Sequence, residues 1–453
     1  MKYVSTRGAA PVLGFSEVLL AGLAVDGGLY VPDSWPELAP GGDGYAGRAA
    51  ALMQPFVGGS IDPATFQRLC REAYASFRVP DVAPLVQIGP RHHLLELFHG
   101  PTLAFKDVAM QLIGRLFDHV LAAEGRRVTI VAATSGDTGS AAIEAVRRCA
   151  SVDIVVLYPH GRVSEVQRRQ MTTVDSPNVA TVAVEGTFDD CQDLVKAMFN
   201  DAPFREANSL SAVNSINWAR VMAQVVYYVT ALEALGRPAS FSVPTGNFGN
   251  VLAGWIARRL GAPVERLVVA SNRNDILTRF FETRRMEVLG VVPTLSPSMD
   301  IQVSSNFERM LFEMNGRDGA ATAGQMRAFR SDGALSVSGA QWDEWIAPVF
   351  RAGRCDDDQT LATIARVHSE TGMLVDPHTA VGIAAAPACG DGDVVTLATA
   401  HPAKFPDAVE RATGVRPALP AHLADLLERP ERTVVLPNDL AAIEAFVTSH
   451  RTR

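Results

Sequence analysis

One lysine of this chain lies where an ammonium group is an unusual choice. Only four of the 41 basic residues are lysines, namely Lys2, Lys106, Lys196 and Lys404, and the others are arginines. Lys106 follows Phe105 and opens a predicted helix with apolar residues at every third or fourth position. Burial favours the neutral amine, which, unlike an arginine, can form a Schiff base with a carbonyl compound. We therefore predict a catalytic Lys106; the alternative is a lysine that extends to the surface.

A loop of small residues at 133–146 has the composition of an anion-binding site. It runs from a predicted strand into a predicted helix, and its residues include Gly136, Gly139, Ser135, Thr138 and Ser140. Glycines allow close approach of the backbone, and a helix N-terminus offers oriented N–H groups. The loop therefore suits a carboxylate or a phosphate, although an ordinary capped helix start is the alternative.

A second glycine-rich loop lies at 242–259 and again joins a predicted strand to a predicted helix. It contains Gly246, Asn247, Gly249 and Asn250. No Gly-Lys dipeptide occurs in the chain, so this loop is not a P-loop. By itself it is only a weak signal for phosphate binding.

The elements that position these loops follow an α/β pattern. Short β-branched runs, apolar on both faces, alternate with segments of helical periodicity from about Leu85 onward. We predict strands within 127–134, 152–159, 179–186, 240–246, 266–272 and 393–400. The pattern indicates mostly parallel sheets with helices on both faces, in which ligands bind beyond the carboxyl ends of the strands.

The chain divides into unlike regions. Residues 1–84 alternate helical patterns with turns rich in proline and glycine, which predicts a small, mainly helical N-terminal module. Residues 85–453 form the predicted catalytic core, made of two α/β subdomains with the active site between them. Within that core, 283–358 is less regular and is predicted to be an insertion or a long connection.

Composition excludes several other classes. The net charge is −8 and no basic cluster occurs, so nucleic acids and anionic membranes are not expected partners. No run approaches the roughly 18 apolar residues of a membrane span, and the N-terminal residues do not resemble a signal peptide. A cytoplasmic enzyme is expected. The five cysteines are dispersed without a CxxC pair, which argues against a disulfide framework and against a zinc site.

Taken together, the lysine and the two loops resemble those of pyridoxal-phosphate enzymes of fold type II, the fold of the tryptophan synthase β-subunit. More closely, the chain is similar to the bacterial and fungal branch of the threonine synthase family over almost its whole length. The segments that carry this resemblance are MKYVSTRG, GGLYVP, HGPTLAFKD, ATSGDTGSAA, NSINWAR, PTGNFGN, SPSMDIQVSSNFER, DPHTAVG and ATAHPAKFP.

The resemblance implies a role for each matching residue. Lys106 would hold pyridoxal 5′-phosphate covalently, and a cup for the cofactor phosphate would consist of Gly246, Asn247, Phe248, Gly249 and Asn250. The hydroxyl of Thr399, or of nearby Thr396, would face the pyridine nitrogen. Ser135 and Thr138 would hold the substrate carboxylate. Asp137 stands where many relatives have asparagine, and if it faces the cofactor 3′-oxygen, one of the two must hold a proton.

The implied reaction converts O-phospho-L-homoserine and water into L-threonine and phosphate, by γ-elimination followed by addition of water at the β-carbon. It makes the chain a carbon–oxygen lyase acting on phosphates. The substrate phosphate needs a second anion site, for which we nominate Ser164, Arg168 and Asn214, although Arg168 could belong to a solvated helix face. Lys404, between two prolines, could either contact a phosphate or fix its loop.

Other functions remain open at this level. A threonine dehydratase or a cysteine synthase would share the lysine and the anion loops but would not need a second phosphate site. A catalytically silent binding module of the same fold is the non-enzyme alternative. The expected partner is the small-molecule substrate alone, and the assembly is expected to be a monomer or a homodimer.

Overall fold

The continuous apolar runs form buried strands, as predicted. In the computed structural model, which describes residues 1–450, every residue is buried in β6 (Val152–Pro159), β9 (Ala239–Pro244) and β14 (Val394–Ala398). Successive residues of β10 (Val264–Ser271) face opposite sides, because Val269 and Val268 belong to different hydrophobic clusters. A strand that is covered on both faces gains from apolar residues at every position, which explains the absence of alternation.

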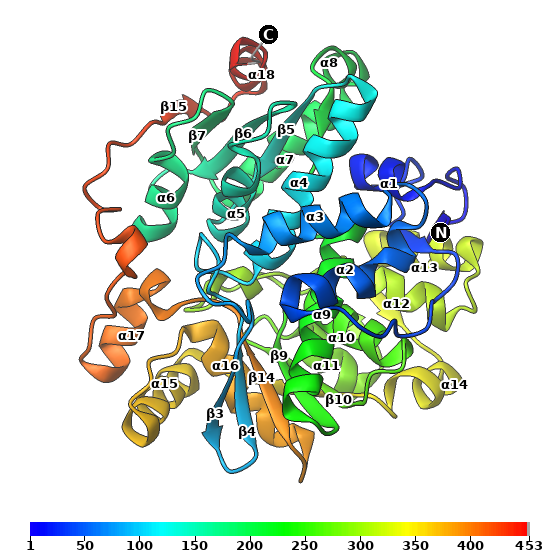
Figure 1. Ribbon diagram of the computed structural model, residues 1–453, viewed down its shortest axis with the longest axis vertical. Helices are drawn as coiled ribbons and strands as arrows, with labels where there is room; N and C mark the ends of the chain where they lie inside the picture. Colours follow the sequence, from blue (N-terminus) through cyan, green and yellow to red (C-terminus); the bar gives the residue numbers. More distant parts are fainter. Residues whose placement is uncertain (451–453) are drawn as a thin grey trace.

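One subdomain contains a sheet of five parallel strands, in the upper half of Figure 1. Their order is β15 (Val434–Pro437), β7 (Val179–Glu185), β6, β5 (Val128–Ala133) and β8 (Leu210–Ser211). One face packs with α4 (Lys106–Glu124), α5 (Asp137–Val146) and α6 (Glu165–Thr172). The other face packs with α7 (Phe188–Asn200) and α18 (Leu440–His450), while α8 (Ala202–Ala207) follows α7.

The other subdomain contains a six-stranded sheet. Its order is β13 (Phe350–Arg354), β10, β9, β14, β4 (His92–Glu96) and β3 (Leu85–Gly89), and only β3 is antiparallel to its neighbour. The surrounding helices are α9 (Trp218–Leu235), α10 (Gly249–Arg259), α11 (Ile276–Thr283), α15 (Asp357–Thr371), α16 (Pro377–Ala385) and α17 (Pro406–Thr413). Helices α10 and α16 cover opposite faces. The predicted α/β class with mostly parallel sheets is therefore confirmed.

The N-terminal region joins the same core. It comprises β1 (Tyr3–Ser5), α1 (Phe15–Ala21), β2 (Tyr30–Pro32), α2 (Gly44–Val57) and α3 (Pro63–Tyr74). The rings of Tyr3 and Phe56 lie 5.9 and 5.7 Å from that of Trp218 in α9. This region therefore packs directly against a helix of the larger subdomain.

The segment 283–358 holds short elements and one edge strand. These elements are β11 (Arg285–Glu287), a 3-10 turn (Pro297–Met299), α12 (Phe307–Met314), α13 (Gly319–Asp332), β12 (Ala334–Ser336), α14 (Gly339–Gln341) and a π-helical turn (Trp342–Ile346). Near the end of the segment, β13 pairs with β10, and α15 begins at Asp357. The predicted boundaries of the N-terminal module, core and insertion stay predictions, and residues 451–453 of the core lie outside the described residues.

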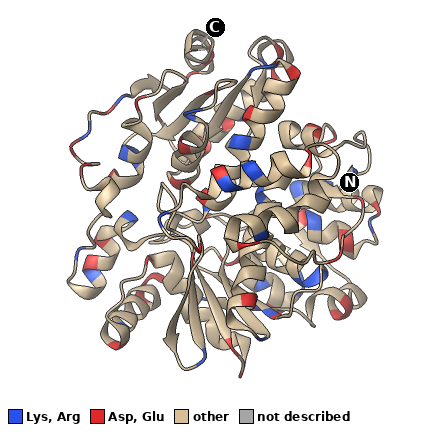
Figure 2. Cartoon of the chain, in the orientation of Figure 1, with Lys and Arg blue, Asp and Glu red and all other residues tan. Residues whose placement is uncertain are grey.

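Membrane-spanning helices and metal-binding clusters are both absent from residues 1–450. No helix among residues 1–450 is long and apolar enough to cross a membrane. Basic and acidic residues are interspersed over the elements in Figure 2. All five cysteines are free, and these residues contain no group of three or more histidine, cysteine and acidic side chains that suits a metal ion.

Candidate active site

A backbone bridge brings the two unusual lysines together across the sequence. The segment before α4 pairs with the segment after β14: Phe105 N donates to Thr399 O at 2.8 Å, and His401 N donates to Leu103 O at 3.0 Å. Lys106 follows the first segment. Lys404 ends a 3-10 turn (Pro402–Lys404) that follows the second. Both side chains are buried.

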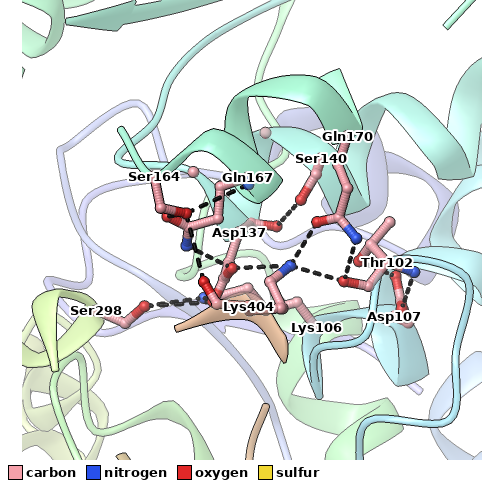
Figure 3. A network of polar contacts seen from close by, with 12 residues as sticks. Thr102, Lys106, Asp107, Asp137, Ser140, Ser164, Gln167, Gln170, Ser298 and Lys404 are labelled. Atoms are coloured by element: carbon pink, nitrogen blue, oxygen red, sulfur yellow. Dashed lines mark hydrogen bonds and ion pairs between the residues drawn. The ribbon is translucent and has the colours of Figure 1, made fainter. Parts of the chain in front are cut away.

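Lys106 forms a buried ion pair with the aspartate of the small-residue loop. Its Nζ atom lies 3.0 Å from Asp137 Oδ2 and 5.3 Å from the centre of the Phe105 ring (Figure 3). Burial lowers the pKa of Lys106, and the positive charges of Lys404 and Arg220 lower it further, whereas Asp137 acts to raise it. The net direction is downward, which favours the neutral, nucleophilic amine.

Asp137 has different partners for its two carboxylate oxygens. Oδ2 faces Lys106, while Oδ1 lies 3.0 Å from Lys404 Nζ and accepts a hydrogen bond from Gln167 Nε2 at 2.8 Å. Burial acts to raise the pKa of Asp137, but Lys106, Lys404 and Gln167 outweigh it and hold this pKa well below its usual range. With these partners the side chain is therefore a carboxylate.

Ser298 also faces the amine of Lys106, and sequence reasoning did not single it out. Its Oγ atom lies 3.4 Å from Lys106 Nζ and 3.5 Å from Asp137 Oδ2. Its backbone N–H donates to His378 Nε2 at 3.3 Å, and the other ring nitrogen of His378 contacts Asp376 Oδ2 at 2.7 Å. The Asp376–His378 pair therefore positions the backbone that presents the Ser298 hydroxyl.

The loop 246–250 forms a narrow cradle at the start of α10. Phe248 has a left-handed φ of 61°, and no side chain caps this helix N-terminus. A Cβ atom on Gly246 would lie only 2.9 Å from Ser298 O. The loop therefore offers uncapped N–H groups beside a backbone that no larger residue would allow so close, as an anion site requires. Gly246, Asn247, Phe248, Gly249 and Asn250 all belong to it.

The structure distinguishes the two candidate threonines. Thr396 Oγ1 contacts His92 Nε2 at 2.8 Å, so its hydroxyl already has a partner within the six-stranded sheet. Thr399 lies at the bridge beside Lys106, is 6% exposed, and uses only its backbone carbonyl there. Its side chain makes no hydrogen bond with residues 1–450, which leaves the hydroxyl available.

The small-residue loop leads into α5, which also lacks a side-chain cap. Thr134 Oγ1 accepts hydrogen bonds from Gly136 N and Gly139 N, each at 2.9 Å, which shapes the turn. Ser135 and Thr138 are half-buried on this turn, next to Asp137. The hydroxyls of Ser135 and Thr138 and the N-terminus of α5 thus lie within two residues of Asp137, the partner of Lys106.

The three residues nominated for a second anion site have different partners in the structure. Ser164 caps α6 and donates to Gln167 Oε1 at 3.0 Å, which connects it to the Asp137 network. Arg168 forms an ion pair with Glu431, in the segment that precedes β15. Asn214 is exposed before α9 and accepts a hydrogen bond from Asn217 N through its backbone carbonyl.

Arg220, from the same NSINWAR segment as Asn214, is a buried cation without an acidic partner among residues 1–450. Its Nη1 atom donates to Val213 O at 3.4 Å, while its Nε atom has no hydrogen-bond partner in this part of the chain. Burial lowers its pKa to about 10, so the guanidinium stays charged at neutral pH. Its charge acts on Lys106, which places an uncompensated cation beside the site.

Sequence reasoning missed Arg220, Ser298, Gln167, Gln170 and His378. Arg220, Ser298 and His378 lie in segments that carry the family resemblance, so those segments were the available signal. Gln167 and Gln170 gave none, because glutamines in a helix are ordinary and only the fold turns them toward Asp137 and Lys404.

Comparison with known families covers most of the chain. Residues 2–74 match the family description "Threonine synthase N terminus", 87–336 match "Pyridoxal-phosphate dependent enzyme", and 379–447 match "Threonine synthase, C-terminal". The middle match includes Lys106 and both anion loops, and the last includes Thr399 and Lys404.

Full-length relatives agree with these matches. The chain is 56% identical to a threonine synthase of Pseudomonas aeruginosa, over 100% of this chain and 99% of that protein. It is 55% identical to a solved threonine synthase of Brucella melitensis, described as bound to PLP, with a TM-score of 0.96 and both chains fully covered. The yeast threonine synthase structure is 36% identical, with a TM-score of 0.93 over 99% of this chain and 98% of that one.

Proposed function

The chain belongs to the threonine synthase family of pyridoxal-phosphate-dependent enzymes, and from this premise we propose how its own residues carry out the reaction. It converts O-phospho-L-homoserine and water into L-threonine and phosphate, the last step of threonine biosynthesis. The observation that carries our assignment of roles is the buried amine of Lys106, 3.0 Å from Asp137 at the uncapped N-terminus of α5 and 3.4 Å from Ser298, whose carbonyl oxygen lies close to Gly246.

The residues present fit the cofactor. The cradle at Gly246–Asn250 has the uncapped N–H groups that a phosphate needs, and only glycine at 246 keeps it open. We propose that this cradle holds the cofactor phosphate, that Lys106 holds its aldehyde carbon, and that the Thr399 hydroxyl faces its pyridine nitrogen. When bound, pyridoxal phosphate supplies an electron sink for negative charge that develops on the substrate carbons.

Protein groups supply substrate binding and proton transfer. We propose that Ser135 and Thr138, with the N-terminus of α5, hold the substrate α-carboxylate, and that Lys106 moves a proton at the α-carbon. Asp137 lies beside both groups and fixes the amine of Lys106 through the 3.0 Å contact.

The substrate phosphate needs a cation that is free to bind it. Ser164, Arg168 and Asn214 remain our nominated set, but Arg168 would have to leave Glu431 to take part. Arg220 needs no such exchange, because no carboxylate among residues 1–450 neutralises it. We therefore propose Arg220 as the principal cation for the phosphate, with Ser164 and Asn214 as further polar groups.

Parallel substrate trials test this function. The purified protein with pyridoxal phosphate is given O-phospho-L-homoserine, L-serine or L-threonine, and phosphate and amino-acid products are measured. We expect equal amounts of phosphate and L-threonine from the first substrate. Turnover of serine or threonine without turnover of O-phospho-L-homoserine would instead favour the dehydratase or cysteine synthase alternative. A protein that gains no visible absorbance with pyridoxal phosphate would favour a silent binding module.

We also propose that the enzyme works in the cytoplasm as a monomer or a homodimer and needs no nucleic-acid or membrane partner. Five free cysteines are consistent with a reducing compartment. Light scattering of the full chain after size-exclusion chromatography measures the oligomeric state directly.

A further inference from the structure

We propose that Lys404 is a positioning residue, which permanently neutralises Asp137 and thereby keeps the amine of Lys106 available for chemistry. The proposal rests on the proposed role of Lys106 and concerns a residue that the assignment above leaves without a function. It depends on the contacts of Lys404, on how Asp137 divides its two oxygens, and on the charges that face Lys106.

Lys404 is engaged by protein groups alone. Its side chain is completely buried, and its Nζ atom contacts Thr102 O at 2.7 Å, Gln170 Oε1 at 2.7 Å and Asp137 Oδ1 at 3.0 Å. The first two contacts are hydrogen bonds and the third is an ion pair, so protein groups engage the ammonium from three sides. Of the two roles that the sequence left open, the structure therefore favours a fixed internal cation over a phosphate contact.

The position of Lys404 is determined by three separate parts of the chain. Gln170 comes from α6, and its Nε2 atom donates to the same Thr102 carbonyl at 3.1 Å. Thr102 is fixed in turn by Asp107, which accepts hydrogen bonds from Thr102 N and Oγ1, both at 2.8 Å. Because Asp107 follows Lys106 directly, the start of α4 and the ammonium of Lys404 share one hydrogen-bonded frame (Figure 3).

Asp137 keeps one cation when it loses the other. Its Oδ2 atom pairs with Lys106, whereas its Oδ1 atom pairs with Lys404 and Gln167. Lys106 gives up its positive charge whenever its amine is used as a nucleophile or a base. A buried carboxylate left without any cation would be very costly, so a second, permanent cation allows Asp137 to stay ionised throughout.

Lys404 also opposes the stabilisation of protonated Lys106 by Asp137. The charges that face the Lys106 amine are Asp137 from α5, Lys404 after β14 and Arg220 from α9, while His378 from α16 acts on Asp137. The positive charge of Lys404 lowers the pKa of Lys106, and Asp137 raises it. Without Lys404, the carboxylate would pair with Lys106 alone and would hold its amine in the protonated form.

The small number of lysines makes a direct test possible. Lysine labelled with carbon-13 at Cε gives four NMR signals in the full chain, which single substitutions assign to Lys2, Lys106, Lys196 and Lys404. The pH midpoint of the Lys106 signal is measured on the cofactor-free protein, so the result does not depend on which substrate the enzyme accepts. A loss of turnover and a failure of this proposal are therefore distinguishable.

The substitutions Lys404→Met and Lys404→Gln should raise the Lys106 midpoint by about one pH unit or more. Lys196→Met, which removes an exposed lysine paired with Asp193, is the matched control and should leave it unchanged. In the cofactor-loaded variants, the acidic limb of the pH profile of kcat/KM should move to higher pH. An unchanged or lowered Lys106 midpoint in both Lys404 variants would overturn the proposal.

A third variant covers the case in which neither Lys404 variant folds. Asp137→Asn keeps the shape of the side chain and removes its charge. The proposal requires the Lys106 midpoint to fall and the Lys404 signal to shift as well, because both lysines share that carboxylate. A Lys404 signal identical to that of the unmodified protein would show that Lys404 and Asp137 do not interact, which also overturns the proposal.

Discussion

The amine of Lys106 and the carboxylate of Asp137 form a buried ion pair with an Nζ–Oδ2 distance of 3.0 Å, although 31 residues separate them. The pair joins the helix that begins at Lys106 to the anion loop that leads into α5. Both side chains are buried, so Lys106 has an acidic neighbour although it does not lie at the surface. Its consequences for cofactor binding, substrate binding and pH dependence can be measured separately.

Lys106→Ala should abolish cofactor attachment and activity while the fold persists. Lys404 still neutralises Asp137 in this variant, so no buried charge is left unpaired. We expect the visible band of the lysine-bound cofactor to disappear and kcat to fall by roughly a thousandfold or more. Lys196→Ala removes an exposed lysine and is the control. Persistence of the band in Lys106→Ala would assign the cofactor to another lysine.

Gly246→Ala should weaken cofactor binding. The added Cβ atom would lie 2.9 Å from Ser298 O, so either the cradle or the segment that carries Ser298 must move. Overpacking of this kind costs about 1–3 kcal/mol, which corresponds to roughly a ten- to hundredfold rise in the Kd of pyridoxal phosphate. Gly59→Ala is a matched control, because no atom lies within 4 Å of its added Cβ. Equal affinities in a fluorescence titration of both variants would contradict this assignment.

Arg220→Met should separate function from stability. Because the guanidinium is buried without an acidic partner among residues 1–450, an apolar side chain of similar length removes an unfavourable charge. We expect an unchanged or higher thermal midpoint, together with a loss of kcat/KM for O-phospho-L-homoserine of roughly a hundredfold.

Arg168→Ala is the comparison for Arg220. It breaks the ion pair with Glu431, so we expect a lower thermal midpoint. The loss of kcat/KM should be smaller than that of Arg220→Met. The reverse pattern, in which Arg168→Ala abolishes turnover and Arg220→Met does not, would return the phosphate site to Arg168.

The fold could be predicted well because buried strands consist of continuous apolar residues, which are visible in the sequence. Strands such as β6 and β9 are buried at every position, so their apolar runs could not be confused with surface strands. Strand β15 is different: its four residues are exposed or half-buried, and it pairs with β7 at the edge of its sheet. Nothing in an isolated exposed run of four residues indicates a sheet 250 residues earlier in the chain.

The site could be predicted only where residue type itself implies chemistry. Lys106 stood out because arginine cannot replace a nucleophilic amine, and the glycines stood out because close backbone approach excludes side chains. The partners of Asp137 depend on tertiary geometry: Gln167 and Lys404 reach the same oxygen from elements 237 residues apart. Arg168 shows the converse, since a basic helix residue looks the same in sequence whether it binds a ligand or Glu431.

Asp107 should make stability depend on pH in a defined window. Burial raises the pKa of Asp107 to about 6 from an ordinary value of 3.8, although its hydrogen bonds from Thr102 act to lower it. Folding therefore favours the protonated form, so the contribution of Asp107 to stability is complete below pH 4 and is lost as the pH rises through 6. A shift of this size corresponds to about 3 kcal/mol.

Asp107→Asn removes this titration, because asparagine is neutral at every pH. The free energy of unfolding of Asp107→Asn, relative to that of the unmodified protein, should therefore increase by about 3 kcal/mol between pH 4 and pH 7, measured by urea unfolding. Asp391→Asn, at an exposed position, is the control and should show a constant difference. If Asp107→Asn also shows a constant difference, Asp107 does not titrate in this window, and the frame that joins Thr102 to Lys404 contains an ordinary carboxylate.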